Sequence, residues 1–188
     1  MKVAVYCSAS NRLSNEYLRL GSTLGAWLAA NGHSLVFGGA TGGLMSSVSE
    51  AFRKVLQHPF GEQRLIGVVT EHIARGGRRA DYCDDLHVVS DMAERKRMMR
   101  ELADCFVCLP GSYGTLDEMF DVISSGTVGE HRKPIFILNY KGFYKGLQTE
   151  EERMRELHFL PEQEVYSSVY ADTMDELLAQ LSAVRTKA

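Results

Sequence analysis

Residues 105–118 read CFVCLPGSYGTLDE, and this stretch decides the fold. Its first five residues are an apolar run without alternation, which is typical of a strand buried on both faces of a sheet. Pro110 ends the run, and Gly111 and Gly114 follow before a helix-like segment that contains Glu118. A buried strand, a tight turn and a helix form the repeating unit of α/β proteins, so this stretch predicts a parallel sheet.

The same unit recurs along the chain. Seven apolar or β-branched runs predict strands: KVAVYCSA (2–9), SLVFGG (34–39), RLIGVV (64–69), LHVVS (86–90), CFVCLP (105–110), PIFILN (134–139) and VYSSVYA (165–171). Apolar spacings of three and four predict helices between them, as in the sets Leu44, Val48, Ala51, Phe52, Val55 and Met92, Met99, Leu102, Ala103. We expect an α/β fold, a Rossmann-like three-layer sandwich with a mainly parallel sheet and helices on both faces.

Shorter signals complete this outline. The last helix is expected to begin at a capping box that runs from Thr173 to Glu176. The segments HPFGEQ (58–63) and ARGGRRADYCDD (74–85) are interpreted as loops. No linker or repeat divides the chain, so residues 1–188 are expected to form a single nucleotide-binding domain.

The composition is that of an ordinary globular protein: 188 residues, 45% hydrophobic, 24% charged, with a net charge of −3. This charge leaves no broad electrostatic footprint for nucleic acid or a membrane surface, so neither is expected as a partner. The N-terminal segment MKVAVYCSAS lacks the apolar core of a signal peptide, and no run approaches the roughly 20 apolar residues that cross a bilayer. We therefore expect a cytoplasmic protein.

The cysteines and histidines give no sign of a metal. Cys105 and Cys108 lie three apart on one predicted strand and therefore point to opposite faces, which is unsuitable for chelation. We interpret these two thiols as buried core residues. The six histidines show no HExxH or similar metal-binding spacing. Neither a metal nor a cofactor is expected.

Small or polar residues follow three of the predicted strands, at 8–11, 38–43 and 110–115. Ligands of open parallel sheets bind beyond the carboxyl ends of the strands, where small residues let backbone N–H groups approach an anion. The alternative is that the glycines only permit tight strand-to-helix turns. The first loop has no GxGxxG and no lysine follows GSYGT, which disfavours a dinucleotide site and a nucleoside triphosphatase.

Two charged residues stand where apolar ones are expected. Ser90 is a plausible N-cap of the helix that follows, and Arg95 interrupts the apolar stripe between Met92 and Met99. The alternative interpretation of Arg95 is a surface arginine whose aliphatic part packs on the protein while its charged end reaches water. Glu118 follows GSYGT, where it could simply favour the dipole of a helix start. A carboxylate, a fixed cation and an anion-binding loop together suit cleavage at an anomeric carbon, because the transition state carries positive charge.

Two long motifs resemble a known family. DMAERKRMM (91–99) and LPGSYGTLDE (109–118) are similar to the paired signature MxxRK and PGGxGTxxE of the LOG (lonely guy) family, the cytokinin riboside 5′-monophosphate phosphoribohydrolases once labelled lysine decarboxylases. VYCSAS (5–10), VFGGATGGLM (36–45) and HRKPIFILNYKGFY (131–144) extend the resemblance over nearly the whole chain. It implies hydrolysis of the N-glycosidic bond of a purine nucleoside 5′-monophosphate, with adenine or an N6-substituted adenine as the base.

The resemblance also assigns residues. Arg95 and Glu118 correspond to the catalytic pair. The substrate-binding positions that it implies are Ser10, Gly39, Ala40, Met92, Lys96, Gly111, Ser112, Tyr113, Gly114, Thr115 and Ser124. A homodimer is expected, partly by resemblance and partly because the helices around 92–99 and 119–123 carry more apolar residues than one sheet face covers.

The chain departs from the family pattern at several positions. Ser8, Ala40, Ser46 and Ser112 replace glycines, and Gly77 stands where the plant enzymes have a glutamate. None of the four glycine replacements removes a charge, so catalysis is expected to survive. Two other functions stay open: a non-catalytic nucleotide carrier or sensor, and an amino-acid decarboxylase. The latter would need a Schiff-base lysine and pyridoxal phosphate, and no lysine stands in a context that singles it out.

Overall fold

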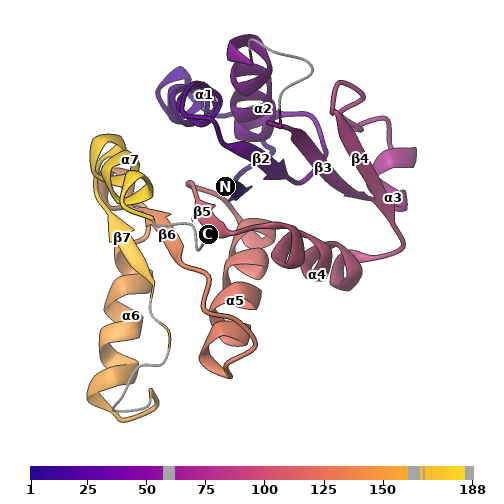
Figure 1. The fold of residues 1–188 in the computed structure, drawn as a ribbon. Coiled ribbons are helices and arrows are strands. Elements are labelled where there is room, and N and C mark those ends of the chain that lie inside the picture. The colour runs from indigo at the N-terminus through magenta and orange to yellow at the C-terminus, as the bar shows by residue number, and fades with distance from the viewer. Residues whose placement is uncertain (57–61, 161–165, 167, 185–188) are drawn as a thin grey trace.

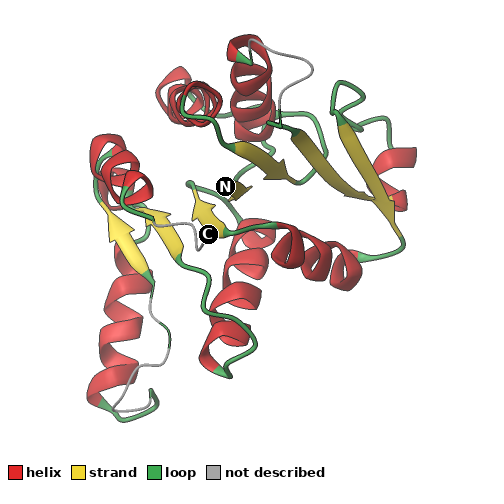
Figure 2. Cartoon of the chain, in the orientation of Figure 1, coloured by secondary structure: helices red, strands yellow, loops and turns green. Residues whose placement is uncertain are grey.

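A computed structural model describes residues 1–56, 62–160, 166 and 168–184. Its strands form one sheet in the order β4-β3-β2-β1-β5-β6-β7, and every pair of neighbours is parallel. The strands are β1 (Lys2–Tyr6), β2 (Ser34–Phe37), β3 (Leu65–Thr70), β4 (Asp85–Val89), β5 (Cys105–Cys108), β6 (Ile135–Leu138) and β7 (Val169–Ala171). The predicted parallel sheet is confirmed, and Figure 2 shows its alternation with helices.

Helices cover both faces of the sheet (Figure 1). They are α1 (Asn15–Ala30), α2 (Gly43–Val55), α3 (Glu71–Arg75), α4 (Met92–Leu102), α5 (Tyr113–Thr127), α6 (Lys145–Glu156) and α7 (Met174–Ser182), with a short 3-10 helix at Tyr140–Gly142. Leucines of α1, α2 and α7 pack on one face, and Met99 of α4 with Met119 and Val122 of α5 pack on the other. The three-layer Rossmann-like architecture is therefore confirmed.

The two faces divide the residues of each central strand between them. On β5, Cys105 and Val107 belong to the core under α1, α2 and α7, whereas Phe106 and Cys108 belong to the core under α4 and α5. The prediction that the two thiols are buried and point to opposite faces is confirmed. Burial raises the pKa of Cys105 to about 12, as expected for a thiol held in an apolar interior.

Close packing of α1 on α2 sets the start of α2. A Cβ added at Gly25 would lie 2.0 Å from the backbone oxygen of Val48, so only glycine allows this approach. Leu44 and Met45 in the first turn of α2 donate backbone N–H groups to the Ser8 carbonyl, at 2.9 and 3.3 Å. These bonds hold the loop after β1 against the first turn of α2.

Several predicted boundaries change. Asp91, not Ser90, is the N-cap of α4, because its carboxylate accepts from the Glu94 N–H. The GSYGT residues 113–115 already belong to α5, so Glu118 lies in the second turn and not at the helix start. The first-turn dipole interpretation of Glu118 is therefore wrong. The capping box at Thr173 and Glu176 is confirmed.

Two loop and strand predictions are only partly covered by the structure. The segment 74–85 is mainly irregular, but α3 includes Ala74 and Arg75, and Asp85 is the first residue of β4. The seventh strand is confirmed only at Val169–Ala171, and residues 165 and 167 of the predicted run lie outside the described part. Most of the loop predicted at 58–63 also lies outside it. No helix in the described ranges is long and apolar enough to span a membrane.

Candidate active site

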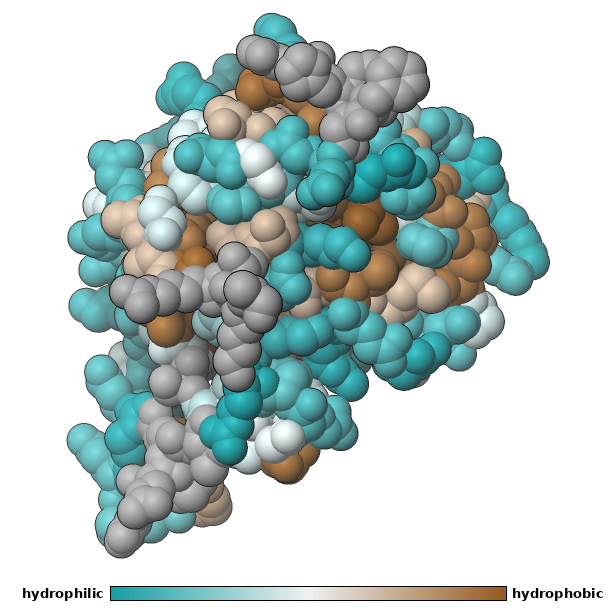
Figure 3. Space-filling view, in the orientation of Figure 1, coloured by the Kyte–Doolittle hydropathy of each residue, from teal (hydrophilic) through white to brown (hydrophobic). Residues whose placement is uncertain are grey.

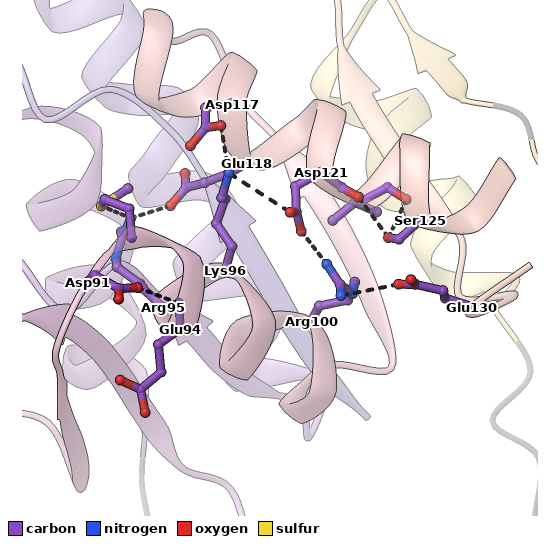
Figure 4. Close-up of polar contacts among 12 residues, drawn as sticks. Asp91, Glu94, Arg95, Lys96, Arg100, Asp117, Glu118, Asp121, Ser125 and Glu130 are labelled. Atoms are coloured by element: carbon purple, nitrogen blue, oxygen red, sulfur yellow. Dashed lines mark hydrogen bonds and ion pairs between the residues drawn. The ribbon is translucent and has the colours of Figure 1, made fainter. Parts of the chain in front are cut away.

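Arg95 and Glu118 form a buried ion pair between α4 and α5. Their side chains are only 4% and 3% exposed, and Arg95 Nη1 lies 2.7 Å from Glu118 Oε1. Figure 4 shows the two side chains pointing toward each other from the two helices. Arg95 Nε also donates to the carbonyl of Val68 on β3, at 2.9 Å. The surface interpretation of Arg95 is therefore wrong, and its guanidinium is held from two sides.

A glycine at the end of β2 makes room for this guanidinium. A Cβ added at Gly38 would lie 2.2 Å from Arg95 Nη2, well inside van der Waals contact. The guanidinium of Arg95 thus lies directly against Gly38, the residue that follows β2. The pair is therefore located under the carboxyl ends of the central strands, where parallel sheets bind their ligands.

Burial raises the pKa of the Glu118 carboxyl, and the nearby Arg95 charge opposes this effect. The Arg95 guanidinium lies 2.7 Å from Oε1, and hydrogen bonding from Arg95 adds to its charge in opposing the effect of burial. The carboxylate is thus held by one cation in a dry environment. Burial raises the pKa of the Tyr6 hydroxyl well above its usual range, and the negative charge of Glu118 adds to this effect.

A pocket of about 190 Å³ opens above the pair. It is lined by Cys7, Ser8, Ala9, Ala40, Met45, Ile73, Arg78, Met92, Arg95, Ser112, Gly114, Thr115 and Glu118. Seven of these residues were predicted as site residues: Ala40, Met92, Arg95, Ser112, Gly114, Thr115 and Glu118. The structure thus brings the expected ion pair, the loop after β5 and part of the loop after β2 to one cavity.

The start of α5 has the features of an anion site. Ser112 is the N-cap, and its side chain makes no capping hydrogen bond. Within the described part of the chain, the backbone N–H groups of Tyr113, Gly114 and Thr115 donate to no acceptor. Such unpaired N–H groups carry the positive end of the helix dipole. Because Ser112, Gly114 and Thr115 also line the pocket, this helix start can receive an anionic group there.

In the second predicted anion loop, at residues 38–43, and in the helix start that follows it, backbone N–H groups already donate to acceptors of the protein itself. At the start of α2, Gly43 N–H donates to Asn11 Oδ1 at 3.0 Å, and the next two N–H groups donate to the Ser8 carbonyl. Gly42 N–H donates to Ser46 Oγ at 2.9 Å. The N–H groups of residues 42–45 are therefore bonded within the protein. This loop contributes Ala40 to the pocket wall, and Met45 of α2 follows it there.

The remaining predicted binding residues do not line the cavity. Ser10 Oγ accepts from the Arg12 N–H, and Gly39, with φ of 61°, packs against the backbone of β3. Gly111 lies against Thr115, where it leaves space for that side chain. Tyr113 is 89% exposed, and Ser124 is exposed further along α5.

Lys96 is engaged elsewhere. Its Nζ lies 2.7 Å from Asp117 Oδ1 and 3.9 Å from Asp121, outside the pocket wall. Arg100 continues this series to Asp121 and Glu130 (Figure 4). The series ties α4 to α5 beside the buried pair, so Lys96 helps to fix the two helices relative to each other.

Six lining residues were not among the predicted site residues: Cys7, Ser8, Ala9, Met45, Ile73 and Arg78. Cys7, Ser8 and Ala9 follow β1 directly, and the general rule on strand ends pointed to that loop without selecting them. Arg78 and Ile73 come from the segment after β3, which has no glycine-rich signature at the strand end. No group of three or more His, Cys, Asp or Glu side chains suited to a metal is found among the described residues.

Comparisons with known proteins show which family this sequence is similar to. A family model described as "possible lysine decarboxylase" matches residues 45–181. The chain is 32% identical over 182 residues to an Oryza sativa subsp. japonica protein named "probable cytokinin riboside 5'-monophosphate phosphoribohydrolase LOGL6", which covers 97% of this chain and 70% of the relative. It is 32% identical over 180 residues to the Arabidopsis thaliana "cytokinin riboside 5'-monophosphate phosphoribohydrolase LOG7", covering 96% and 80%.

Solved structures share the fold. The molybdenum cofactor binding protein from the phototrophic bacterium Rippkaea orientalis has a TM-score of 0.68 with this chain at 18% sequence identity. The match covers 97% of this chain and 95% of that protein. At this level of identity the likeness concerns the fold alone.

Proposed function

Because this chain belongs to the LOG family, we propose that it hydrolyses the N-glycosidic bond of a purine nucleoside 5′-monophosphate to the free base and ribose 5-phosphate. Adenine and N6-substituted, cytokinin-type adenines are the bases that the family suggests. One observation carries the proposal: the buried Arg95–Glu118 pair lies in a pocket whose rim is the uncapped start of α5.

The proposed reaction uses three parts of this pocket. The N–H groups of residues 113–115 bind the 5′-phosphate and thereby align the ribose. The Glu118 carboxylate lies next to the anomeric carbon, stabilises its positive charge as the bond to the base breaks, and accepts a proton from the attacking water. Water thus forms the new C1′–O bond, and the base leaves with the electron pair of the broken C1′–N bond and takes up a proton. Arg95 orients the nucleotide and stabilises the leaving base.

Two other functions are less well supported. A non-catalytic nucleotide carrier would gain nothing from a buried carboxylate beside a phosphate site, because that charge repels the ligand and is costly to desolvate. An amino-acid decarboxylase would need a lysine in the pocket, and no lysine is among the described lining residues. Lys96, the nearest in sequence to the pair, is bound to Asp117 instead.

Release of free base from a nucleotide panel tests the proposal. The panel contains AMP, N6-isopentenyl-AMP, IMP and GMP, with adenosine as the control without phosphate. We expect base and ribose 5-phosphate in equal amounts, and a higher kcat as well as a higher kcat/KM for AMP than for adenosine, because energy gained at the phosphate is used to align the ribose. Comparable kcat/KM for AMP and adenosine would show that α5 holds no phosphate, and absence of release from every nucleotide would refute the proposed activity.

We further propose that the protein is a homodimer. Large apolar side chains are exposed on α4 and α5, among them Met92 at 37%, Phe120 at 44% and Tyr113 at 89%. Figure 3 shows apolar areas among polar ones on the face of the molecule drawn in Figure 1. The pocket is also smaller than the roughly 300–1,000 Å³ of ordinary ligand sites, so a second subunit could complete its wall. Light scattering should give about twice the 21.0 kDa of one chain, and a stable mass of one chain at micromolar concentrations would refute the dimer.

We propose finally that residues 1–188 act as one nucleotide-binding domain in the cytoplasm. One continuous sheet through the described ranges supports the single domain. All four cysteines are free thiols, which suits a reducing compartment. Limited proteolysis that releases a stable fragment retaining nucleotide binding would argue against a single unit.

A further inference from the structure

A turn at residues 109–112 connects β5 to the uncapped start of α5. On the side of β1, the Leu109 N–H donates to the Tyr6 carbonyl at 2.9 Å. The Pro110 carbonyl accepts from the Ser8 N–H on the same side, at the longer distance of 3.4 Å. Because Pro110 has no N–H, the turn offers few backbone groups by which the sheet can hold it.

The side chain of Tyr144 holds this turn from the other side, where β6 lies next to β5. Tyr144 is buried, and its hydroxyl donates to the Leu109 carbonyl at 2.9 Å. Burial raises the pKa of this hydroxyl, and a hydrogen bond from the Gly111 backbone opposes the effect. One side-chain oxygen thus contacts the residues before and after Pro110.

Tyr144 is itself fixed by a buried polar network. Its N–H donates to Asn139 Oδ1 at 2.7 Å. Asn139 follows β6 and is buried, and its Nδ2 donates to Gln148 Oε1 at 3.1 Å and to Asp172 Oδ1 at 2.9 Å. These bonds tie the segment after β6 to α6 and to the end of β7. The hydroxyl is therefore presented to the turn from a defined position.

The turn packs directly on the first residues of α5. A Cβ added at Gly111 would lie 2.1 Å from Thr115 Oγ1, so the two residues are in close contact. Thr115 is buried and lines the pocket together with Ser112 and Gly114. The N–H groups proposed to bind the phosphate belong to residues 113–115, which begin two residues after Gly111. A shift of the turn would therefore change the direction of these N–H groups.

We propose that Tyr144 is a positioning residue for the phosphate, because its hydroxyl holds residues 109–111 so that the N–H groups of residues 113–115 point to the 5′-phosphate. Tyr144 does not line the pocket and therefore acts through the turn. The proposal rests on the proposed function, since it requires a phosphate at the start of α5. It goes beyond that function by assigning part of the phosphate affinity to a hydroxyl 35 residues further along the chain than Leu109.

The test compares Tyr144→Phe with Tyr166→Phe as a matched control. Each change removes one hydroxyl that donates to a backbone carbonyl: that of Leu109 at 2.9 Å for Tyr144, and that of Lys133 at 2.7 Å for Tyr166. Both rings belong to the core under α4 and α5. Tyr166 neither lines the pocket nor bonds the turn, so it reports the loss of such a hydrogen bond elsewhere in the same core.

Dissociation constants for AMP and adenosine are measured by calorimetry in the Glu118→Gln background, where the ligands are not consumed, below the melting temperature of every variant. We expect Tyr144→Phe to weaken AMP binding about tenfold and adenosine binding less than about twofold, because misaligned N–H groups lose hydrogen bonds to a charged ligand group. Tyr166→Phe should leave both constants unchanged, even if it lowers the melting temperature as much as Tyr144→Phe does.

Three results would overturn the inference. Equal weakening of AMP and adenosine by Tyr144→Phe, or equal weakening of AMP by both variants, would show that the hydroxyl supports only the fold. Unchanged AMP binding in Tyr144→Phe would show that the turn keeps its position without the hydroxyl. In the protein with Glu118 intact, the ratio of kcat/KM for AMP to that for adenosine should also fall about tenfold in Tyr144→Phe. Failure to release any base there would refute the proposed hydrolysis, while the binding ratio would still decide the role of Tyr144.

Discussion

Replacing Gly38 with alanine should displace the Arg95 guanidinium without removing any charged group. The new Cβ would lie 2.2 Å from Arg95 Nη2 and 3.0 Å from Met45 Cε. Non-bonded heavy atoms prefer about 3.5–4.0 Å, so the guanidinium must move by more than ~1 Å. Gly38 does not have a positive φ, and alanine therefore brings no backbone strain of its own.

The size of the effect follows from what holds Arg95. Its Nε bonds the Val68 carbonyl at 2.9 Å and its Nη1 lies 2.7 Å from Glu118, so a movement of this size breaks at least one contact. A misplacement of about 1 Å in an active site can cost on the order of 10²-fold in rate. Overpacking of a core position costs about 1–3 kcal/mol, which for a chain of this size corresponds to roughly 2–12 °C in melting temperature.

The assay is kcat for AMP together with the melting temperature, in a cycle with Arg95→Met. We expect Gly38→Ala to lower kcat by about 10²-fold alone and to have little further effect once Arg95 is methionine, since the clash has then been removed. Gly146→Ala in α6 is the control: a Cβ there meets nothing within 4 Å, and activity should not change. If Gly38→Ala lowers the melting temperature but keeps kcat within about threefold, the position of Arg95 does not matter for the reaction.

Three further predictions concern the carboxylate and the phosphate loop. Glu118→Gln should retain nucleotide binding by calorimetry and lose about 10²-fold or more in kcat, because an amide neither stabilises a cation nor accepts a proton; near-normal kcat would exclude Glu118 from the mechanism. Because burial raises the Glu118 pKa above 4.5, kcat/KM should fall as pH drops through that raised pKa. Over the same window, down to the unfolded pKa, this group should increase the free energy of unfolding as pH falls, since the folded state binds the proton more tightly. A pH titration of both quantities checks this, and Glu118→Gln should remove the contribution to stability. Ser112→Gly should lower kcat/KM for AMP several-fold and leave adenosine unchanged, since the free hydroxyl can donate to a phosphate; improved turnover of AMP would mean that Ser112 crowds the phosphate.

The sheet and the buried pair could be predicted from the sequence because local patterns report them. Uninterrupted apolar runs identify strands covered on both faces. Arg95 stood out because it interrupts a helical stripe, and its 4% exposure confirms the direction that the stripe indicated. Helix geometry also explains the position of Lys96. It lies one residue further along α4 than Arg95 and therefore points about 100° away, toward Asp117.

Other parts of the site depend on contacts between distant segments, which composition does not reveal. In the sequence, the loops after β2 and β5 both have the small residues of an anion-binding loop. After β2, however, the N–H of Gly43 donates to Asn11, which lies 32 residues away in the sequence. Arg78 reaches the pocket because its segment is bridged to residues 39–41. Neither arrangement follows from a period of two or 3.6 residues, and both require the folded order of the strands.

The burial of the pair is the basis on which, in the proposed reaction, it favours the transition state over the bound substrate. A buried ion pair is costly to desolvate and repays that cost only with good geometry and further hydrogen bonds. Here the pair is close, and burial raises the pKa of Glu118 even though the charge of Arg95 and a hydrogen bond from it act in the opposite direction. A neutral ribose in the bound substrate adds no positive charge near the Glu118 carboxylate. In the proposed reaction, the positive charge that develops at C1′ as the base leaves gives the carboxylate a second positive partner in a site of low dielectric. This interaction strengthens as the bond breaks, which is the condition for an increase in kcat.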